Sequence, residues 1–156
     1  MNNRKNIPKI IAFILVAIML FTLVGCSDSG EQGTLTVGEK AISRHTTVYD
    51  EYATVSLCDV ISALGFELAW ESEDKASFYC DDVKYELCVS QKKLIREGKD
   101  DNYLICSPDN ENFVCDVIDG VLIVDDITLK ALFCTFMNYP INVFVDSENN
   151  SVIISR

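Results

Sequence analysis

The chain has 156 residues, with 13 lysines and arginines against 24 aspartates and glutamates, and its formal net charge is −11 at pH 7. Phosphate backbones repel a chain of this charge, which argues against nucleic acid as a partner. Residues 35–156 suffice for one modest hydrophobic core and not for two, so we expect one domain.

The N-terminus has the pattern of an export signal. Three basic residues lie among the first nine, and residues 10–24 form an uncharged, strongly apolar run. The sequence Leu23, Val24, Gly25 and Cys26 follows, and it resembles the lipobox of bacterial lipoproteins. There the cysteine thiol is diacylated and becomes the new N-terminus. We predict a signal peptide over 1–25 and lipid attachment at Cys26. An uncleaved membrane anchor is the weaker alternative, because a membrane span needs about 20 apolar residues and the run over 10–24 is shorter.

The mature chain would be more acidic still. Removal of residues 1–25 takes away three basic residues and leaves 10 against 24 acidic ones, a net charge of −14. Such a surface does not lie flat on anionic lipid, so the acyl chain on Cys26 would hold the protein at the outer face of the cytoplasmic membrane. Residues 26–34 are small and polar, and we predict a short tether there.

The first structural unit begins with a strand, a bend at Gly38 and a second strand over 35–42. A helix is predicted from Ser56, which with Asp59 forms a capping-box start, to Gly65, which supplies the stop. Its apolar stripe follows the helical spacing i, i+3, i+4 and i+7, at positions Leu57, Val60, Ile61 and Leu64.

A β-hairpin is predicted after this helix. Phe66, Leu68 and Trp70 alternate with polar or small residues, so we expect a half-buried strand with Trp70 in the core. Residues 71–75 form the turn and 76–80 the return strand. A further strand is predicted over 83–89, after a turn at Asp81 and Asp82.

The middle of the chain is polar. Residues 91–102 are predicted as a solvated loop with a strand fragment at Leu94 and Ile95. Strands over 103–106 and 113–118 would flank a turn at Pro108. Cys106 and Cys115 also flank that turn, and they are candidates for a disulfide across a hairpin.

The other cysteines leave several pairings open. Six thiols remain after Cys26 is lipidated, which permits 15 pairings into three disulfides. The chain has ample apolar residues for a core, so buried reduced cysteines are the alternative. The six are Cys58, Cys80, Cys88, Cys106, Cys115 and Cys134.

A second unit with the same pattern is predicted near the C-terminus. A strand over 121–124 leads to an N-cap at Asp125 or Asp126 and to a helix with apolar residues at Leu129, Leu132, Phe133 and Phe136. Alternation over 141–145, a turn over 146–150 and a return strand over 151–154 complete it. The fold class is therefore α+β, with two short helices on largely antiparallel strands and an internal duplication of a strand–helix–hairpin unit.

The first unit resembles a known family. A strand, a helix that ends in Ala63-Leu64-Gly65, and a strand that ends in Trp70-Glu71 are similar to the copper amine oxidase N-terminal-like domain, also called a stalk-like domain. This resemblance covers residues 35–156. It implies a surface module of Gram-positive bacteria that carries no chemistry of its own. One histidine, His45, cannot form a three-histidine copper site, so no cofactor or metal is expected.

The sequence offers little for catalysis. His45 lies in a polar connection, and the pairs Asp81-Asp82, Asp100-Asp101 and Asp125-Asp126 each lie at a predicted turn or cap. We therefore expect a non-enzymatic, lipid-anchored interaction or assembly module of a Gram-positive cell envelope, with an envelope protein or the cell wall as its partner. A small-ligand or ion-binding lipoprotein is the alternative, and a cysteine-dependent hydrolase fits least.

Overall fold

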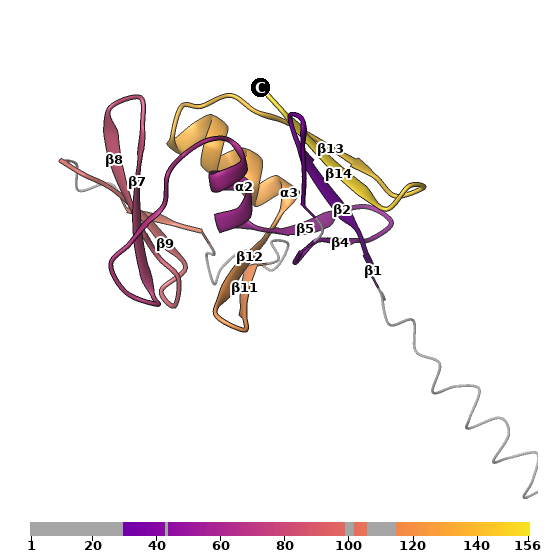
Figure 1. The fold of residues 1–156 in the computed structure, drawn as a ribbon, viewed down its shortest axis with the longest axis horizontal. Helices are drawn as coiled ribbons and strands as arrows, with labels where there is room; N and C mark the ends of the chain where they lie inside the picture. Colours follow the sequence, from indigo (N-terminus) through magenta and orange to yellow (C-terminus); the bar gives the residue numbers. More distant parts are fainter. Residues whose placement is uncertain (1–29, 43, 99–101, 106–114) are drawn as a thin grey trace, which may run out of the picture.

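The structure is a computed structural model that describes residues 30–42, 44–98, 102–105 and 115–156. The predicted signal peptide, Cys26 and Cys106 lie outside these ranges. Within these ranges, three β-sheets surround two short helices (Figure 1). The α+β class is confirmed, and every neighbouring strand pair but one is antiparallel in the described part of the chain.

The central sheet carries both helices. Its strand order is β1 (Glu31–Gln32), β4 (Thr47–Val48), β5 (Ala53–Ser56), β12 (Val121–Asp125) and β11 (Cys115–Ile118). Helix α2 (Leu57–Ala63) follows β5 directly. Helix α3 (Asp126–Lys130) follows β12 directly and continues as a π-helix, η1 (Ala131–Phe136).

The predicted helix starts are confirmed at both units. The hydroxyl of Ser56 accepts a hydrogen bond from the amide of Asp59 at 3.2 Å, and the carboxylate of Asp125 accepts one from the amide of Thr128 at 2.6 Å. These side chains satisfy amides that have no partner inside the helix. Gly65 has φ +97°, the left-handed conformation that ends α2.

Each helix is followed by a hairpin that belongs to a separate outer sheet. The first outer sheet has the order β10 (Asn102–Leu104), β9 (Lys93–Arg96), β8 (Val83–Cys88), β7 (Lys75–Cys80) and β6 (Ala69–Trp70). The second has the order β13 (Asn142–Asp146), β14 (Ser151–Ser155), β2 (Thr34–Val37) and β3 (Lys40–Ile42). The parallel pair β14–β2 joins the C-terminal hairpin to the start of the domain. Figure 1 places the two outer sheets on opposite sides of the helices.

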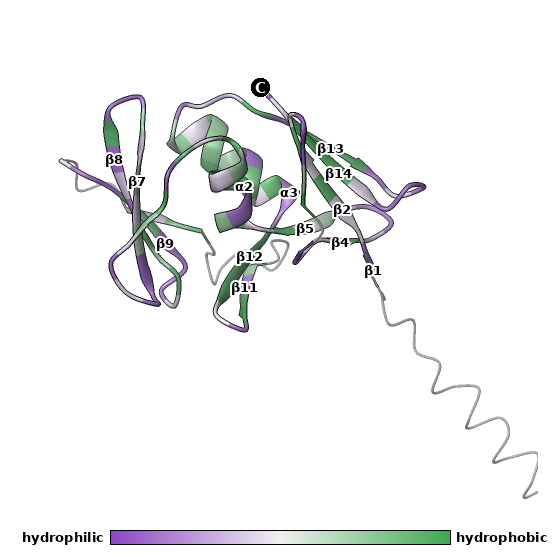
Figure 2. Cartoon of the chain, in the orientation of Figure 1, coloured by the Kyte–Doolittle hydropathy of each residue, from purple (hydrophilic) through white to green (hydrophobic). Residues whose placement is uncertain are grey.

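The core lies where the helices meet the sheets. Phe78 stacks on Tyr85 with ring centroids 5.5 Å apart, and Phe66 meets Tyr139 edge-on at 5.1 Å. Figure 2 shows apolar segments along β12 and β13 and polar segments at the hairpin turns. The largest fully buried side chains are Tyr85, Phe78, Phe133, Leu35, Leu57, Ile61, Leu87, Leu94, Leu122, Leu129, Leu132 and Ile154.

Three sequence predictions need correction here. The strands predicted on either side of Pro108 do not form a hairpin, because β10 pairs with β9 and β11 pairs with β12, in different sheets. The predicted tether is also too long, since Glu31, Gln32 and Thr34 lie in strands. The fragment predicted at Leu94 is a full strand, and Leu94 itself is buried because β9 pairs with β8.

Candidate functional site

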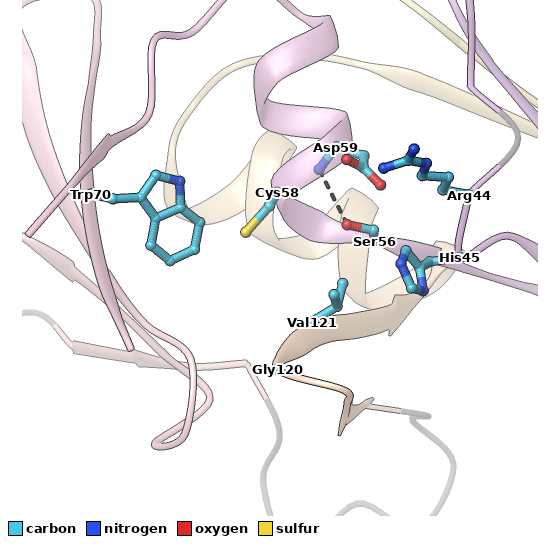
Figure 3. Close-up of a pocket in the computed structure, with 8 residues that line it drawn as sticks. All are labelled: Arg44, His45, Ser56, Cys58, Asp59, Trp70, Gly120 and Val121. Carbon is cyan, nitrogen blue, oxygen red and sulfur yellow. Dashed lines mark hydrogen bonds between the residues drawn. The ribbon is translucent and has the colours of Figure 1, made fainter. Parts of the chain in front are cut away.

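Trp70 lines two hollows. The first has a volume of about 230 Å³, and the second, of about 390 Å³, is lined by the consecutive residues Trp70, Glu71, Ser72 and Glu73. Figure 3 shows the first hollow at the N-terminal end of α2. Its lining residues come from four separate parts of the chain: Arg44, His45, Ser56, Cys58, Asp59, Trp70, Gly120 and Val121.

The prediction that Trp70 belongs to the core is wrong. Its side chain is 50% exposed. Residues 66–68 do not form a strand, because the amide of Phe66 still bonds to the carbonyl of Ile61, 3.2 Å away, at the end of α2. Only Ala69 and Trp70 pair with β7, where Trp70 lies opposite Ala76. Since β6 is the last strand of its sheet, the indole lies at the sheet edge and not beneath a helix.

Arg44 and His45 supply the basic part of the first hollow. Both belong to the connection between β3 and β4, both are exposed, and His45 has φ +52°. Figure 3 shows them across the start of α2 from Trp70. The polar connection predicted around His45 is exposed in the structure, but the sequence pattern did not place this histidine near Asp59 or Trp70.

The first turn of α2 supplies Ser56, Cys58 and Asp59. Burial, with a smaller contribution from the neighbouring Asp59 carboxylate, raises the pKa of the Cys58 thiol from its ordinary 9.0 to about 11. A thiol that stays protonated at neutral pH is a poor nucleophile. Figure 3 also shows the Cys58 sulfur directed toward Trp70, while His45 lies on the other side of the hollow. The two residues are therefore not arranged as a nucleophile and its base.

The acidic pairs have structural roles where the structure describes them. Asp81 and Asp82 form the β7–β8 turn with positive φ angles, and Asp125 caps α3. Asp146 accepts hydrogen bonds from the backbone and side chain of Asn149, which lower the pKa of its carboxyl. Asp100 and Asp101 lie outside the described residues. No group of three or more potential metal ligands occurs among the residues that the structure describes.

The cysteines divide into bonded and free thiols. Cys115 is disulfide-bonded, whereas Cys58, Cys80, Cys88 and Cys134 are free. Cys106 lies outside the described residues, so the Cys106–Cys115 pairing stays a prediction. Of the free thiols, Cys80 and Cys88 are buried and Cys134 is exposed.

Comparison with protein-family models, with curated protein sequences and with solved structures gives no match. Within the described ranges, no helix is both long enough and apolar enough to cross a membrane. We call Trp70, together with Glu71, Glu73, Arg44 and His45, the Trp70 surface.

Proposed function

We propose that the chain is a non-enzymatic, lipid-anchored module that mediates interaction or assembly outside the cytoplasmic membrane of a Gram-positive cell. Cys26 carries the lipid, and the described domain presents the Trp70 surface to an envelope partner. The observation that carries this proposal is the half-exposed Trp70, which lines both hollows. Tryptophan is the residue type most enriched at binding hot spots, because it buries a large rigid surface on contact.

A macromolecular partner fits this surface better than a small ligand does. Small-molecule sites usually enclose about 300–1,000 Å³ and bury most of the ligand within apolar walls. The first hollow is smaller, about 230 Å³, and two of its lining residues are exposed cationic or imidazole side chains. The larger hollow is formed by one short run of four residues, three of them polar. Neither would enclose a ligand, but both would accept side chains from a second surface.

The absence of catalysis is part of the proposal. It is supported by the protonated state of Cys58, by the separation of Cys58 from His45 across the hollow, and by the structural roles of the described acidic pairs. A screen of the purified domain against ester, peptide, amine and glycan substrates tests it. Turnover that is lost in His45→Ala, or after thiol alkylation, without unfolding would contradict it.

The internal duplication and the resemblance to the copper amine oxidase N-terminal-like domain also belong to the proposal. In support of a duplication, β5 and β12 pair with each other, each is followed at once by a capped helix, and each helix leads to a hairpin. The two N-caps, Ser56 and Asp125, are equivalent in this arrangement. A stalk-like module would have this fold and no catalytic activity of its own.

The experiment that tests the proposal is quantitative capture from solubilised envelope. The wild-type domain, Trp70→Ala and Phe144→Ala are immobilised at equal density. Phe144 is the matched control, because it is an aromatic residue with 60% exposure on β13, in the other outer sheet. We expect partners that Phe144→Ala retains and Trp70→Ala loses. Equal capture by all three proteins would contradict the role of Trp70.

A further inference from the structure

The two hollows beside Trp70 differ in charge. Glu71 and Glu73 line the second hollow, and none of its described lining residues is basic. The described lining of the first hollow includes Arg44 and His45 together with one carboxylate, Asp59. An incoming charged group therefore meets a different electrostatic environment in each hollow.

The acidic side keeps its negative charge. Lys75 lies 3.3 Å from Glu71 and 2.9 Å from Glu86, so one ammonium is shared between two carboxylates. The carboxylate of Asp74 is already hydrogen-bonded, because the amide and the hydroxyl of Ser90 donate to its two oxygens at 2.7 and 2.8 Å. Glu73 is exposed at the tip of the same turn. The turn as a whole has three acidic residues, Glu71, Glu73 and Asp74, against Lys75.

An indole face attracts cations, and neighbouring carboxylates strengthen that attraction. The whole chain adds to it at longer range, since its formal net charge is −11. Arg44 and His45 make the first hollow less favourable for a cation. The negative charge and the aromatic ring thus both favour a cation beside Trp70, in the hollow lined by Glu71 and Glu73.

We propose that the Trp70 surface binds a basic peptide segment of its partner, with a lysine or arginine side chain lying on the indole at the Glu71 and Glu73 side. This inference rests on the proposed function and specifies the chemistry of the partner. It predicts electrostatically steered association that weakens as salt rises.

Trp70 is the only tryptophan in the chain, so intrinsic fluorescence reports on this surface alone. The probes are two capped heptapeptides, acetyl-Gly-Ser-Lys-Gly-Lys-Ser-Gly-amide and the same peptide with glutamate in place of lysine. We expect the lysine peptide to change the fluorescence at low salt and to bind at least about tenfold more tightly than the glutamate peptide. Equal affinities would overturn the inference.

Variants locate the binding by calorimetry. The double variant Glu71→Gln with Glu73→Gln should weaken the lysine peptide about three- to tenfold, and Trp70→Leu should do the same. Phe144→Leu should leave its affinity unchanged. A loss of affinity in Phe144→Leu equal to that in Trp70→Leu would overturn the inference.

Collisional quenching gives an independent readout of the charge around the indole. The quenching constant of each ion for Trp70 is divided by the constant of the same ion for free N-acetyltryptophanamide, because iodide is intrinsically the stronger quencher of indole. This ratio should be higher for caesium than for iodide, and the double glutamine variant should bring the two ratios closer together. A higher ratio for iodide than for caesium in the wild type would overturn the inference. If envelope capture depends on Trp70 but the lysine peptide does not bind, the basic-segment inference fails while the interaction function stands.

Discussion

Val55 of β5 and Val124 of β12 lie directly opposite each other in the central sheet, and each is the residue immediately before the N-cap of its helix. On either side, Thr54 pairs with Asp125 and Ser56 with Ile123. This register is symmetric about the Val55–Val124 pair. Each helix also contacts the strand of the other unit, so the two strand–helix units form one interlocked centre.

This pairing predicts energetic coupling between the two units. Both valines are fully buried, so Val55→Ala and Val124→Ala should each cost about 2 kcal/mol of unfolding free energy. Because the residues are direct neighbours, the double variant should depart from additivity by at least about 0.5 kcal/mol. Urea unfolding measures all three. Val152, buried in the second outer sheet, is the control, and Val152→Ala combined with Val55→Ala should be additive. Additivity of the two central valines would contradict the interlocked centre.

The exposure of Trp70 predicts a small stability cost on truncation. A residue that is half-exposed on a two-residue edge strand contributes little to the core, so Trp70→Ala should cost less than about 1.5 kcal/mol. Phe78→Ala, at a residue 1% exposed, should cost about 3–5 kcal/mol. Urea unfolding of both variants makes the comparison. A loss of unfolding free energy in Trp70→Ala as large as that in Phe78→Ala would show that Trp70 belongs to the core.

Cys58 should be the slow thiol at neutral pH. Its pKa is raised to about 11 by burial and by Asp59, so its alkylation should accelerate as pH rises toward 11. The folded state favours the neutral thiol over the thiolate, which is why the pKa is higher in the folded protein than in the unfolded chain. The resulting stability is therefore fully present below pH 9 and is lost as pH rises through 11. Peptide-resolved mass spectrometry after timed iodoacetamide labelling measures the rate, with the exposed thiol Cys134 as internal reference. Labelling of Cys58 as fast as that of Cys134 at pH 7 would contradict this assignment.

The proposed lipid anchor can be tested independently of the fold. Metabolic labelling with a fatty acid should mark the wild-type protein and not Cys26→Ala, because the thiol of Cys26 is the proposed acceptor. Cys134→Ala controls for acylation elsewhere and should label normally. Equal labelling of wild type and Cys26→Ala would exclude the lipoprotein assignment.

Local features of the fold were predictable from the sequence. The caps at Ser56 and Asp125 accept hydrogen bonds from amides three residues ahead, and the bend predicted at Gly38 has φ +59°, a conformation that favours glycine. The helical stripes were also correct, since helical spacing is a property of one segment.

Non-local features were not predictable in the same way. Alternation at Phe66, Leu68 and Trp70 indicates which faces a strand would have, but not where pairing starts or whether the strand lies at an edge. Strands β10 and β11 follow each other along the chain, yet they join different sheets because each has another partner. The site was not predictable either, because Arg44 and His45 reach the first hollow only when four separate segments come together in the fold.

The Trp70 surface is the proposed contact between the module and its partner. The most direct measurement is site-specific photo-crosslinking in living cells, with a benzophenone amino acid in place of Trp70 or, as control, of Phe144. We expect a discrete crosslinked species from position 70 that is absent from position 144 and that weakens in the Glu71→Gln, Glu73→Gln background. A species from position 144 alone, or equal yields from both positions, would contradict this role of Trp70.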